Sequence, residues 1–322
     1  SKLEFDYVYS NDVSVFDLND NIYWKLIFNS SDYYVLQYPR KIYDGTISRN
    51  DTAGWKNQPD NSSIVWADDN YMGTTLLNRL NIFFIRFKDQ LTQYNLRNNI
   101  SSYVDFVYNQ NMLIAKHLLY NGISNDDGFY AHGYNALNDE HSCCSWLRAN
   151  AWVLLSKVEA LKMYDILIDS EYNNINYTKQ KNDILLLYQN QMNKMASFQD
   201  KNTGLFHQVL NDSSTYLELS GSNAMFQSMI FGYLNKYLPT NIYDMTQWND
   251  MINKTWNDGL SKYINPNNDG RFENSCIGCG IENSAEIYNE RGTEYCQSGD
   301  PGGPGFVISS LVAYQDYLDS FM

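Results

Sequence analysis

Four stretches of the chain are apolar on nearly every side when they are drawn as helices. They span residues 66–80, 146–161, 220–234 and 302–318. A helix that is apolar all round is buried on all sides. We therefore expect these four stretches to form the interior of the fold.

Three further stretches carry apolar residues on one side and polar residues on the other. They span residues 100–119, 177–197 and 243–264, and each lies between two of the apolar stretches. Such a stripe is typical of an outer helix that covers an inner one. The alternation has a period of roughly 65 to 85 residues, which predicts an α/α toroid. No stretch shows sustained alternation with a period of two, so a β-sandwich is not expected.

Short Gly-containing turns recur along the chain ahead of these apolar helices. In a toroid the inner helices all begin at one end, so their first turns and the turns that precede them surround one cavity. Helix capping alone would also place polar residues there. The candidate site residues at this end are Trp66, Asp68, Asp69, His132, Tyr134, Trp146, Arg148, Trp152 and His207.

Two adjacent carboxylates, Asp68 and Asp69, stand at the start of the first apolar helix. An Asp at a helix start ordinarily caps the backbone and complements the helix dipole, and one residue is enough for that. Neighbouring carboxylates in a partly enclosed cavity raise each other's pKa, and burial adds to the shift. We therefore predict that Asp69 donates and accepts a proton, while Asp68 caps the helix or orients its neighbour.

Two side chains near the start of the second inner helix admit two interpretations each. His132 is one of four histidines, and a lone histidine is more often structural, but this one lies in a Gly-containing turn before an inner helix. Arg148 stands between Trp146 and Trp152, where a buried guanidinium needs an anionic partner. That partner is either an Asp or Glu of the chain or the carboxylate of a substrate, for which the planar fork is well suited.

Composition narrows the class of protein. The chain has 322 residues with 43% hydrophobic content, enough for one large core or two smaller ones. No apolar run approaches the roughly 20 residues of a membrane span. The net charge of −14 argues against nucleic acid as a partner. Aromatic content is 15%, which either fills core and surface or supplies platforms on which sugar rings stack.

Several features favour a secreted glycoprotein. The chain opens on Ser1 without a visible signal peptide, which we interpret as a mature or trimmed chain. Sequons for N-glycosylation begin at Asn29, Asn50, Asn61, Asn99, Asn176, Asn211 and Asn253. Each is weak alone in an Asn-rich chain, but together they fit secretion.

Five cysteines form two clusters and a remainder. Cys143 and Cys144 are adjacent, Cys276 and Cys279 form a C-x-x-C unit, and Cys296 is left over. Zinc bound with His141 is one alternative, but a second C-x-x-C is lacking. We favour disulfides between the two clusters in an oxidising compartment.

Five motifs in the same order resemble a known enzyme family. They are "KIYDGTISR", "WADDNYMG", "DGFYAHGYN", "WLRANAWVLL" and "YLELSGSNAMF". From about residue 39 to the C-terminus the chain resembles the unsaturated rhamnogalacturonyl hydrolases of glycoside hydrolase family 105 and the related unsaturated glucuronyl hydrolases of family 88. The resemblance implies an all-α, (α/α)6-barrel catalytic domain over residues 1–322. The segment from Asp20 to Pro39 is short for a full helical hairpin, which indicates a shortened N-terminal hairpin.

The resemblance also implies a reaction. Such enzymes remove a 4,5-unsaturated uronic acid from the non-reducing end of oligosaccharides that polysaccharide lyases release, for example from pectin. A catalytic Asp protonates C4 of the enol ether, water adds at C5, and the hemiketal opens. One carboxylic acid does the proton transfer, in contrast to ordinary glycosidases with two. Neither a metal nor an organic cofactor is implied.

The family's functional residues are matched position by position. Its general acid/base matches Asp69, and its histidine matches His132. The Trp and Arg of its W-x-R motif match Trp146 and Arg148, with Trp152 as a further wall, so that tryptophans stack on the sugar and Arg148 binds its carboxylate. A second, upstream Asp is expected, for which Asp20 is the candidate. Leu147 and Ala151 replace glycines of the family motif, which affects the choice of substrate.

Two other classes of function are compatible with a toroid. An endo-α-mannanase would have an open groove and act on a saturated polymer, with no need for Arg148. A non-enzymatic glycan-binding toroid would tolerate Asp69→Asn. The order of the motifs favours the first function, with an unsaturated oligosaccharide as substrate, no nucleic-acid or membrane partner, and a secreted monomer as the expected form.

Overall fold

The computed structural model describes residues 22–38, 42–49, 55, 63–89, 91, 97–120, 128–263, 274–276, 278–295 and 302–322. Most of these residues are helical. The predicted upstream residue Asp20 lies outside the described residues.

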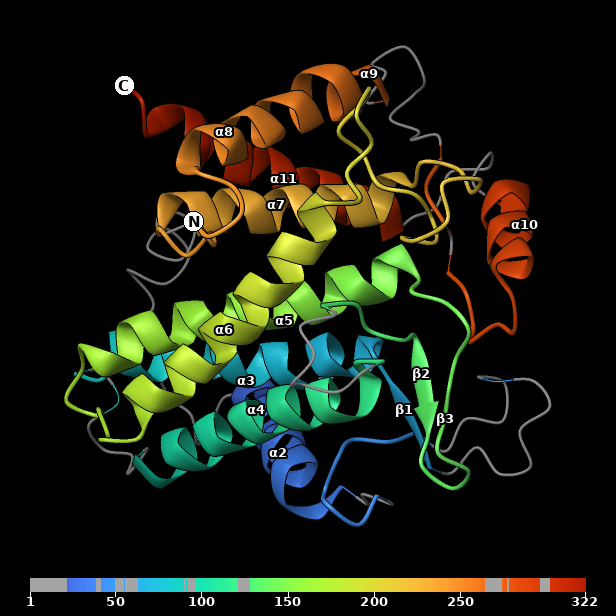
Figure 1. Cartoon of the computed structure of the whole chain (residues 1–322). Coiled ribbons are helices and arrows are strands. Elements are labelled where there is room, and N and C mark those ends of the chain that lie inside the picture. The colour runs from blue at the N-terminus through green and yellow to red at the C-terminus, as the bar shows by residue number, and fades with distance from the viewer. Residues whose placement is uncertain are drawn as a thin grey trace.

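Four helices form the inner row of the fold. They are α3 (Asp68–Arg86), α5 (Leu147–Ile168), α7 (Leu219–Leu234) and α11 (Gly302–Asp319). Helix α3 packs on α5, α5 on α7, and α7 on α11. All four begin at the same end of the molecule, where the small β-sheet and α10 lie (Figure 1). The predicted inner helices and their common orientation are therefore confirmed.

Outer helices cover this row as the amphipathic pattern predicts. Helix α4 (Arg97–Leu118) packs on α3, α6 (Tyr177–Ala196) on α5, and α8 (Met245–Lys254) on α7. The last of these continues through the π-helical η5 (Thr255–Leu260) into α9 (Ser261–Tyr263). Inner and outer helices alternate along the chain, which is the predicted α/α arrangement (Figure 1).

The N-terminal described segment supplies one further helical element. Helix α2 (Ile22–Asp32) runs directly into η2 (Tyr33–Gln37). Phe28 stacks on Phe84 of α3 with ring centroids 5.3 Å apart, and Tyr103 of α4 donates a 2.6 Å hydrogen bond to Asp32. These contacts attach α2 to the first inner and outer helices.

Helix α11 departs from the prediction that every inner helix is buried on all sides. Phe306 and Val307 are buried, but Ile308 is 64% exposed and Val312 47% exposed. The reason is that α11 stands at the end of the row and packs mainly on α7. Its apolar sequence therefore overstated its burial.

A small antiparallel sheet connects the loops at the common end of the inner helices. Its strands are β1 (Ile64–Trp66), β2 (Gly133–Asn135) and β3 (Glu140–His141), in the order β1-β2-β3. Trp66 pairs with Gly133, and the N–H of Ala67 donates to the carbonyl of His132 at 3.0 Å. This register places the start of α3 beside His132.

Gly133 permits a close approach of two loops in this region. A Cβ at this position would lie 2.1 Å from Cδ1 of Ile281. The absence of a side chain therefore lets residues 278–282 pack against β2. Helix α10 (Ala285–Tyr295) follows this segment and lies at the same end of the molecule (Figure 1).

Lys157, in the middle of α5, is a buried lysine whose pKa links the stability of the fold to pH. It is fully buried, and its Nζ donates to Tyr130 Oη at 2.8 Å and to Gln191 Oε1 at 2.7 Å. Burial lowers the pKa of Lys157 well below its usual value. In the unfolded chain a lysine keeps its proton up to about pH 10.4. Between these two pKa values the unfolded state binds the extra proton, so stability rises with pH.

We therefore expect this rise to weaken in Lys157→Met. The measurement is urea unfolding of wild type and variant in steps from neutral pH towards pH 10. The exposed Lys179→Met serves as the matched control and should follow wild type. Identical pH dependence in wild type and Lys157→Met would contradict a neutral, buried lysine.

Candidate active site

The first pair of predicted residues that the fold brings together is Asp68 and His132. Oδ2 of Asp68 lies 3.3 Å from Nε2 of His132, which is fully buried. The N-cap residue of α3 is Ala67, which makes no side-chain capping bond, so Asp68 belongs to the first helical turn. Its carboxylate is therefore directed to the histidine.

The pKa of Asp68 moves against the prediction. Burial by itself raises the pKa, but the interaction with His132 and the charge of Arg49 hold it below the usual value. The expectation that two adjacent carboxylates would raise each other's pKa is thus wrong for Asp68. These interactions with His132 and Arg49, which the local sequence does not show, outweigh burial.

Asp69 forms an ion pair with Arg49, which the list of predicted site residues does not include. Nε and Nη2 of Arg49 lie 2.7 Å and 2.5 Å from Oδ1 of Asp69. The guanidinium also lies 4.7 Å above the ring of Trp66. Arg49 ends the motif "KIYDGTISR", and its N–H donates to the carbonyl of Ile64 at 3.1 Å. The motif contained the signal, but only the pairing with β1 shows where the side chain lies.

Two tryptophans enclose His132. The ring of Trp66 meets the imidazole edge-on with centroids 5.2 Å apart, and the ring of Trp146 lies 4.6 Å away. Both tryptophans are buried, and within the described part of the chain neither indole N–H has a hydrogen-bond partner. Buried donors are ordinarily satisfied. These two groups are therefore available to a ligand oxygen or to water.

Tyr288 holds His132 from the opposite side. Its Oη lies 2.7 Å from Nδ1 of His132 and accepts the N–H of Glu282 at 3.1 Å. Because the backbone already donates to this oxygen, its own proton is directed to Nδ1. The remaining ring nitrogen then carries its hydrogen towards Asp68. Nothing in the local pattern marks Tyr288, which is 156 residues away from His132 along the chain.

Replacing Tyr288 by Phe should remove the contact that fixes the tautomer of His132. Without the phenol, Nδ1 has lost its donor, so we expect the ring nitrogens to show a mixture of tautomers by ¹⁵N NMR. The loss of one hydrogen bond, about 0.5–1.5 kcal/mol, corresponds to a fall in catalytic rate of up to roughly tenfold. Tyr164→Phe, which removes a distant buried phenol, is the control. Unchanged ¹⁵N shifts of His132 in Tyr288→Phe would refute the positioning role.

Arg148 forms its contacts with side chains of the protein itself. Its Nε donates to Ser220 Oγ at 2.9 Å, and Nη2 lies 3.6 Å from Oε1 of Glu218. Glu218 is fully buried and caps α7 by accepting the N–H groups of Ser220 and Gly221 at 3.0 and 2.7 Å. Of the two interpretations of Arg148, the structure shows the pair with a glutamate. This pair joins the starts of α5 and α7 behind Trp146, over which the guanidinium lies at 5.6 Å.

Three of the predicted residues lie in other clusters. Trp152 packs between Tyr71 and Phe306, each 4.8 Å away between centroids, among the inner helices. Tyr134 stacks on His117 at 5.1 Å. His207 binds the carbonyl of Thr215 through Nδ1 at 2.5 Å.

The structure therefore gathers the five residues Trp66, Asp68, Asp69, His132 and Trp146 directly, with Arg148 behind them. For Tyr134 the reason is the strand geometry, since the β2–β3 hairpin directs its hydroxyl to Asp139 at 3.0 Å. For Trp152 the reason is its position in the second turn of α5, beyond the loop end.

The cysteines pair differently from the prediction. Cys143 and Cys144 form a disulfide with each other, while Cys276 and Cys279 are free thiols 3.3 Å apart. A disulfide between the two clusters is therefore wrong, because each sulfur faces the other member of its own cluster. Cys296 lies outside the described residues. Among the described residues, no group of three or more His, Cys, Asp or Glu side chains is placed to hold a metal ion.

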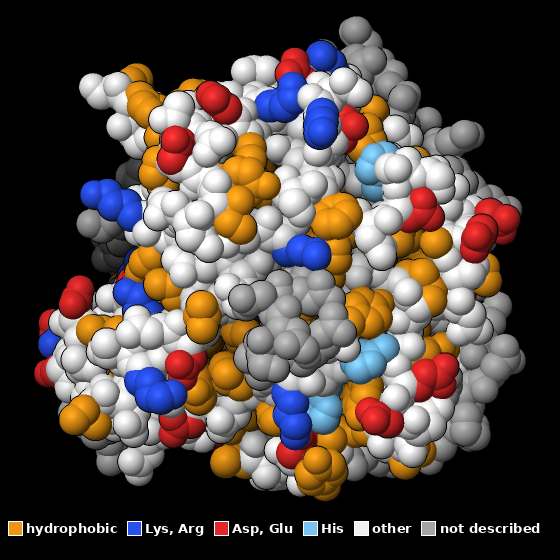
Figure 2. All heavy atoms as spheres, in the orientation of Figure 1, with side chains coloured by type: hydrophobic (Ala, Val, Ile, Leu, Met, Phe, Trp, Pro, Cys, Tyr) orange, Lys and Arg blue, Asp and Glu red, His pale blue; other side chains and the backbone are white. Residues whose placement is uncertain are grey.

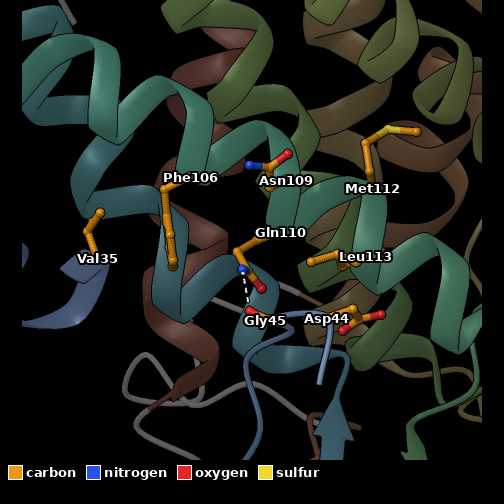
Figure 3. A pocket seen from close by; sticks show the side chains of 8 residues that line it. All are labelled: Val35, Asp44, Gly45, Phe106, Asn109, Gln110, Met112 and Leu113. Carbon is orange, nitrogen blue, oxygen red and sulfur yellow. Dashed lines mark hydrogen bonds between the residues drawn. The ribbon is translucent and has the colours of Figure 1, made fainter. Parts of the chain in front are cut away.

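A separate cavity of about 490 Å³ is lined by α4, by Val35 of η2 and by residues 44–45 (Figure 3). There Gln110 donates to the carbonyl of Gly45 at 3.0 Å, and Asp44 and Met112 also line the cavity. None of the predicted site residues lines this cavity. The chemistry thus gathers at the helix starts and not in the cavity.

Acidic and basic side chains are interspersed on the face of the molecule shown in Figure 2. The described residues on this face form no continuous basic surface. In the described parts of the chain, no helix combines the length and apolar character that crossing a membrane requires.

Comparison with known proteins identifies the family. The model of Glycosyl Hydrolase Family 88 matches residues 18–315. The chain belongs to glycosyl hydrolase family 88. A comparison with curated proteins found no match.

Solved structures show the same fold as this family 88 protein. A possible family 105 member from Salmonella enterica serovar Paratyphi A is 17% identical, with a TM-score of 0.69 over 95% of this chain and 69% of that one. A family 105 glycoside hydrolase from C. acetobutylicum is 16% identical, with a TM-score of 0.66 over 94% and 77%. The unsaturated glucuronyl hydrolase from Bacillus sp. GL1 is 12% identical, with a TM-score of 0.57 over 93% and 70%.

These findings confirm the resemblance inferred from the five motifs and the all-α, (α/α)6-barrel fold class. Family 88 membership makes the protein a glycoside hydrolase, and its substrate is accordingly an oligosaccharide.

Proposed function

We propose that this family 88 protein removes a 4,5-unsaturated uronic acid from the non-reducing end of oligosaccharides made by polysaccharide lyases. The observation that carries the proposal is the placement of Asp69, which pairs with Arg49 and follows Asp68, whose partner His132 lies between two tryptophan rings. The glucuronyl hydrolase with the same fold is described as responsible for the degradation of glycosaminoglycan, which supports a uronic acid as the group removed.

Asp69 is the general acid of the proposed reaction. Its carboxylic acid protonates C4 of the enol ether, water adds at C5, and the resulting hemiketal opens to release the rest of the chain. A single positioned carboxyl group is sufficient, because no glycosyl–enzyme bond forms. Trp66 and Trp146 supply indole N–H donors to the oxygens of the substrate.

Arg49 connects substrate binding to the protonation of Asp69. The side chain is 35% exposed, whereas Arg148 is nearly buried and already pairs with Glu218. Arg49 is therefore the better placed of the two cations to bind the substrate carboxylate. When its guanidinium turns to that carboxylate, Asp69 loses its cationic partner and holds a proton more readily. Binding of the substrate thus favours the protonated form of Asp69, which its cleavage requires.

The test is a substrate panel with matched saturated controls. Unsaturated rhamnogalacturonan and glucuronan disaccharides are mixed with the protein, and the ultraviolet absorbance of the C4–C5 double bond is followed. We expect absorbance to fall with at least one unsaturated disaccharide, and no cleavage of its saturated counterpart. Arg49→Lys, which keeps the charge but loses the fork, should raise KM more than it lowers kcat. Cleavage of saturated α-mannan with no change in either unsaturated disaccharide would refute the proposal.

A further inference from the structure

Two free thiols lie in contact next to the starts of α5 and α7. Sγ of Cys276 and Sγ of Cys279 are 3.3 Å apart. Cys276 is fully buried, whereas Cys279 is partly exposed, and Nε2 of Gln208 lies 3.7 Å from its sulfur. Cys279 is therefore the member of the pair nearer to solvent, and its sulfur is in contact with the buried sulfur of Cys276.

The electrostatic surroundings favour loss of one proton from the pair. The hydrogen bond from the Cys279 thiol lowers the pKa of Cys276 to about 7, with the charge of Arg148 acting in the same direction against burial. The same hydrogen bond raises the pKa of Cys279. The pair therefore shares one proton near neutral pH. Thiolates are the reactive form in exchange with disulfides.

We propose that Cys276 and Cys279 are a dithiol site that low-molecular-weight disulfides, such as oxidised glutathione, convert to an intramolecular disulfide. The proton between the two sulfurs moves to Cys276, and the thiolate of Cys279 attacks one sulfur of the small disulfide, whose S–S bond breaks and whose other half leaves as a thiolate that takes up a proton from solvent. Cys276 then attacks the mixed disulfide on Cys279 and releases the second half as a thiol. Two electrons pass from the two sulfurs to the small disulfide, which becomes two thiols. One of the two protons comes from the site and the other from solvent. This inference does not rest on the proposed hydrolase function.

Closing the bond acts on a backbone that supports the active site. The sulfurs must approach to about 2.05 Å. The N–H of Cys276 donates to Oε1 of Glu218 at 3.0 Å, and the carbonyl of Asn274 accepts the N–H of Leu219 at 2.8 Å. The disulfide would therefore fasten the segment that holds the Glu218–Arg148 pair. We expect slower hydrogen exchange at residues 274–276 and 278–282 in the oxidised protein.

The experiment uses the full chain with Cys296→Ser, which removes the fifth cysteine. The protein is equilibrated in buffers with different ratios of reduced to oxidised glutathione, free thiols are alkylated, and peptides are mapped by mass. We expect Cys276 and Cys279 to lose alkylation together as the buffer becomes oxidising, and to appear as one cross-linked peptide. A double variant, Cys143→Ser with Cys144→Ser, should titrate at the same ratio.

Cys276→Ser separates this mechanism from simple oxidation of an exposed thiol. It leaves the attacking sulfur of Cys279 without the one that resolves the intermediate, so we expect it to stop with one glutathione attached. Thiols that stay alkylated at every ratio, or a cross-link from either residue to Cys143 or Cys144, would overturn the proposal. If Cys276→Ser does not fold, the peptide map of the Cys296→Ser chain still gives the answer.

Discussion

Asp69→Asn is expected to lower kcat/KM on an unsaturated disaccharide by about 10²–10⁴, the range that general acid catalysis supplies. Asparagine keeps the shape of the side chain, and its oxygen can still accept from Arg49, so the ion pair is replaced by a neutral hydrogen bond. What is lost is the transferable proton. The measurement is the initial rate of absorbance loss at several substrate concentrations, with circular dichroism to confirm an unchanged fold.

The matched control is Asp183→Asn, which removes a surface carboxylate on α6 that pairs with Lys179. Its kcat/KM should equal that of wild type. Asp68→Asn should fall between the two, because it weakens the partner of His132 without removing the proton donor. An Asp69→Asn variant with full activity would exclude this residue as the acid and would favour the glycan-binding alternative.

Glu218→Gln is expected to lower the free energy of unfolding by about 3–5 kcal/mol, the range for breaking one partner of a buried ion pair. Glu218 is fully buried and accepts the N–H groups of Ser220, Gly221 and Cys276 in addition to its contact with Arg148. The neutral amide leaves the guanidinium buried without its countercharge and weakens the cap of α7. Urea unfolding followed by circular dichroism measures the loss.

Glu140→Gln on the exposed strand β3 provides the comparison and should change stability by less than about 0.5 kcal/mol. Combining Glu218→Gln with Arg148→Met should recover part of the loss, because the second substitution removes the uncompensated charge. A loss below about 1 kcal/mol in Glu218→Gln would contradict the structural role of the pair.

The positions of the helices could be predicted from the sequence because the local periodicity of apolar residues indicates which face of a helix is buried. The prediction of an inner helix over 146–161 corresponds to α5, and that of an outer helix over 177–197 corresponds to α6. A helix repeats every 3.6 residues, so the side on which apolar residues fall shows which face meets the core. The exception was α11, since an apolar sequence states that a face can be buried but not whether a neighbour covers it.

Part of the candidate active site could also be predicted from the sequence, because its residues lie at the starts of helices or in the turns before them. Asp68, Asp69 and His132 stand at the start of an inner helix or in the turn before one, and the sheet register then brings them together. The charged and hydrogen-bonding partners of these residues could not be predicted in this way. Arg49 is 20 residues from Asp69 and Tyr288 is 156 residues from His132, and no local pattern specifies such pairs.

The sequence by itself determined the alternation of inner and outer helices, their common starting end and the family motifs, because each depends on residues close together in the chain. Only the tertiary structure decided that Arg148 binds Glu218, that Tyr134 and His207 lie elsewhere, and that the cysteines pair within their clusters. The physical reason is that charge pairs and thiol contacts depend on distances between separate elements. Those distances follow from the packing of the whole fold, while periodicity reports only which side of each element is buried.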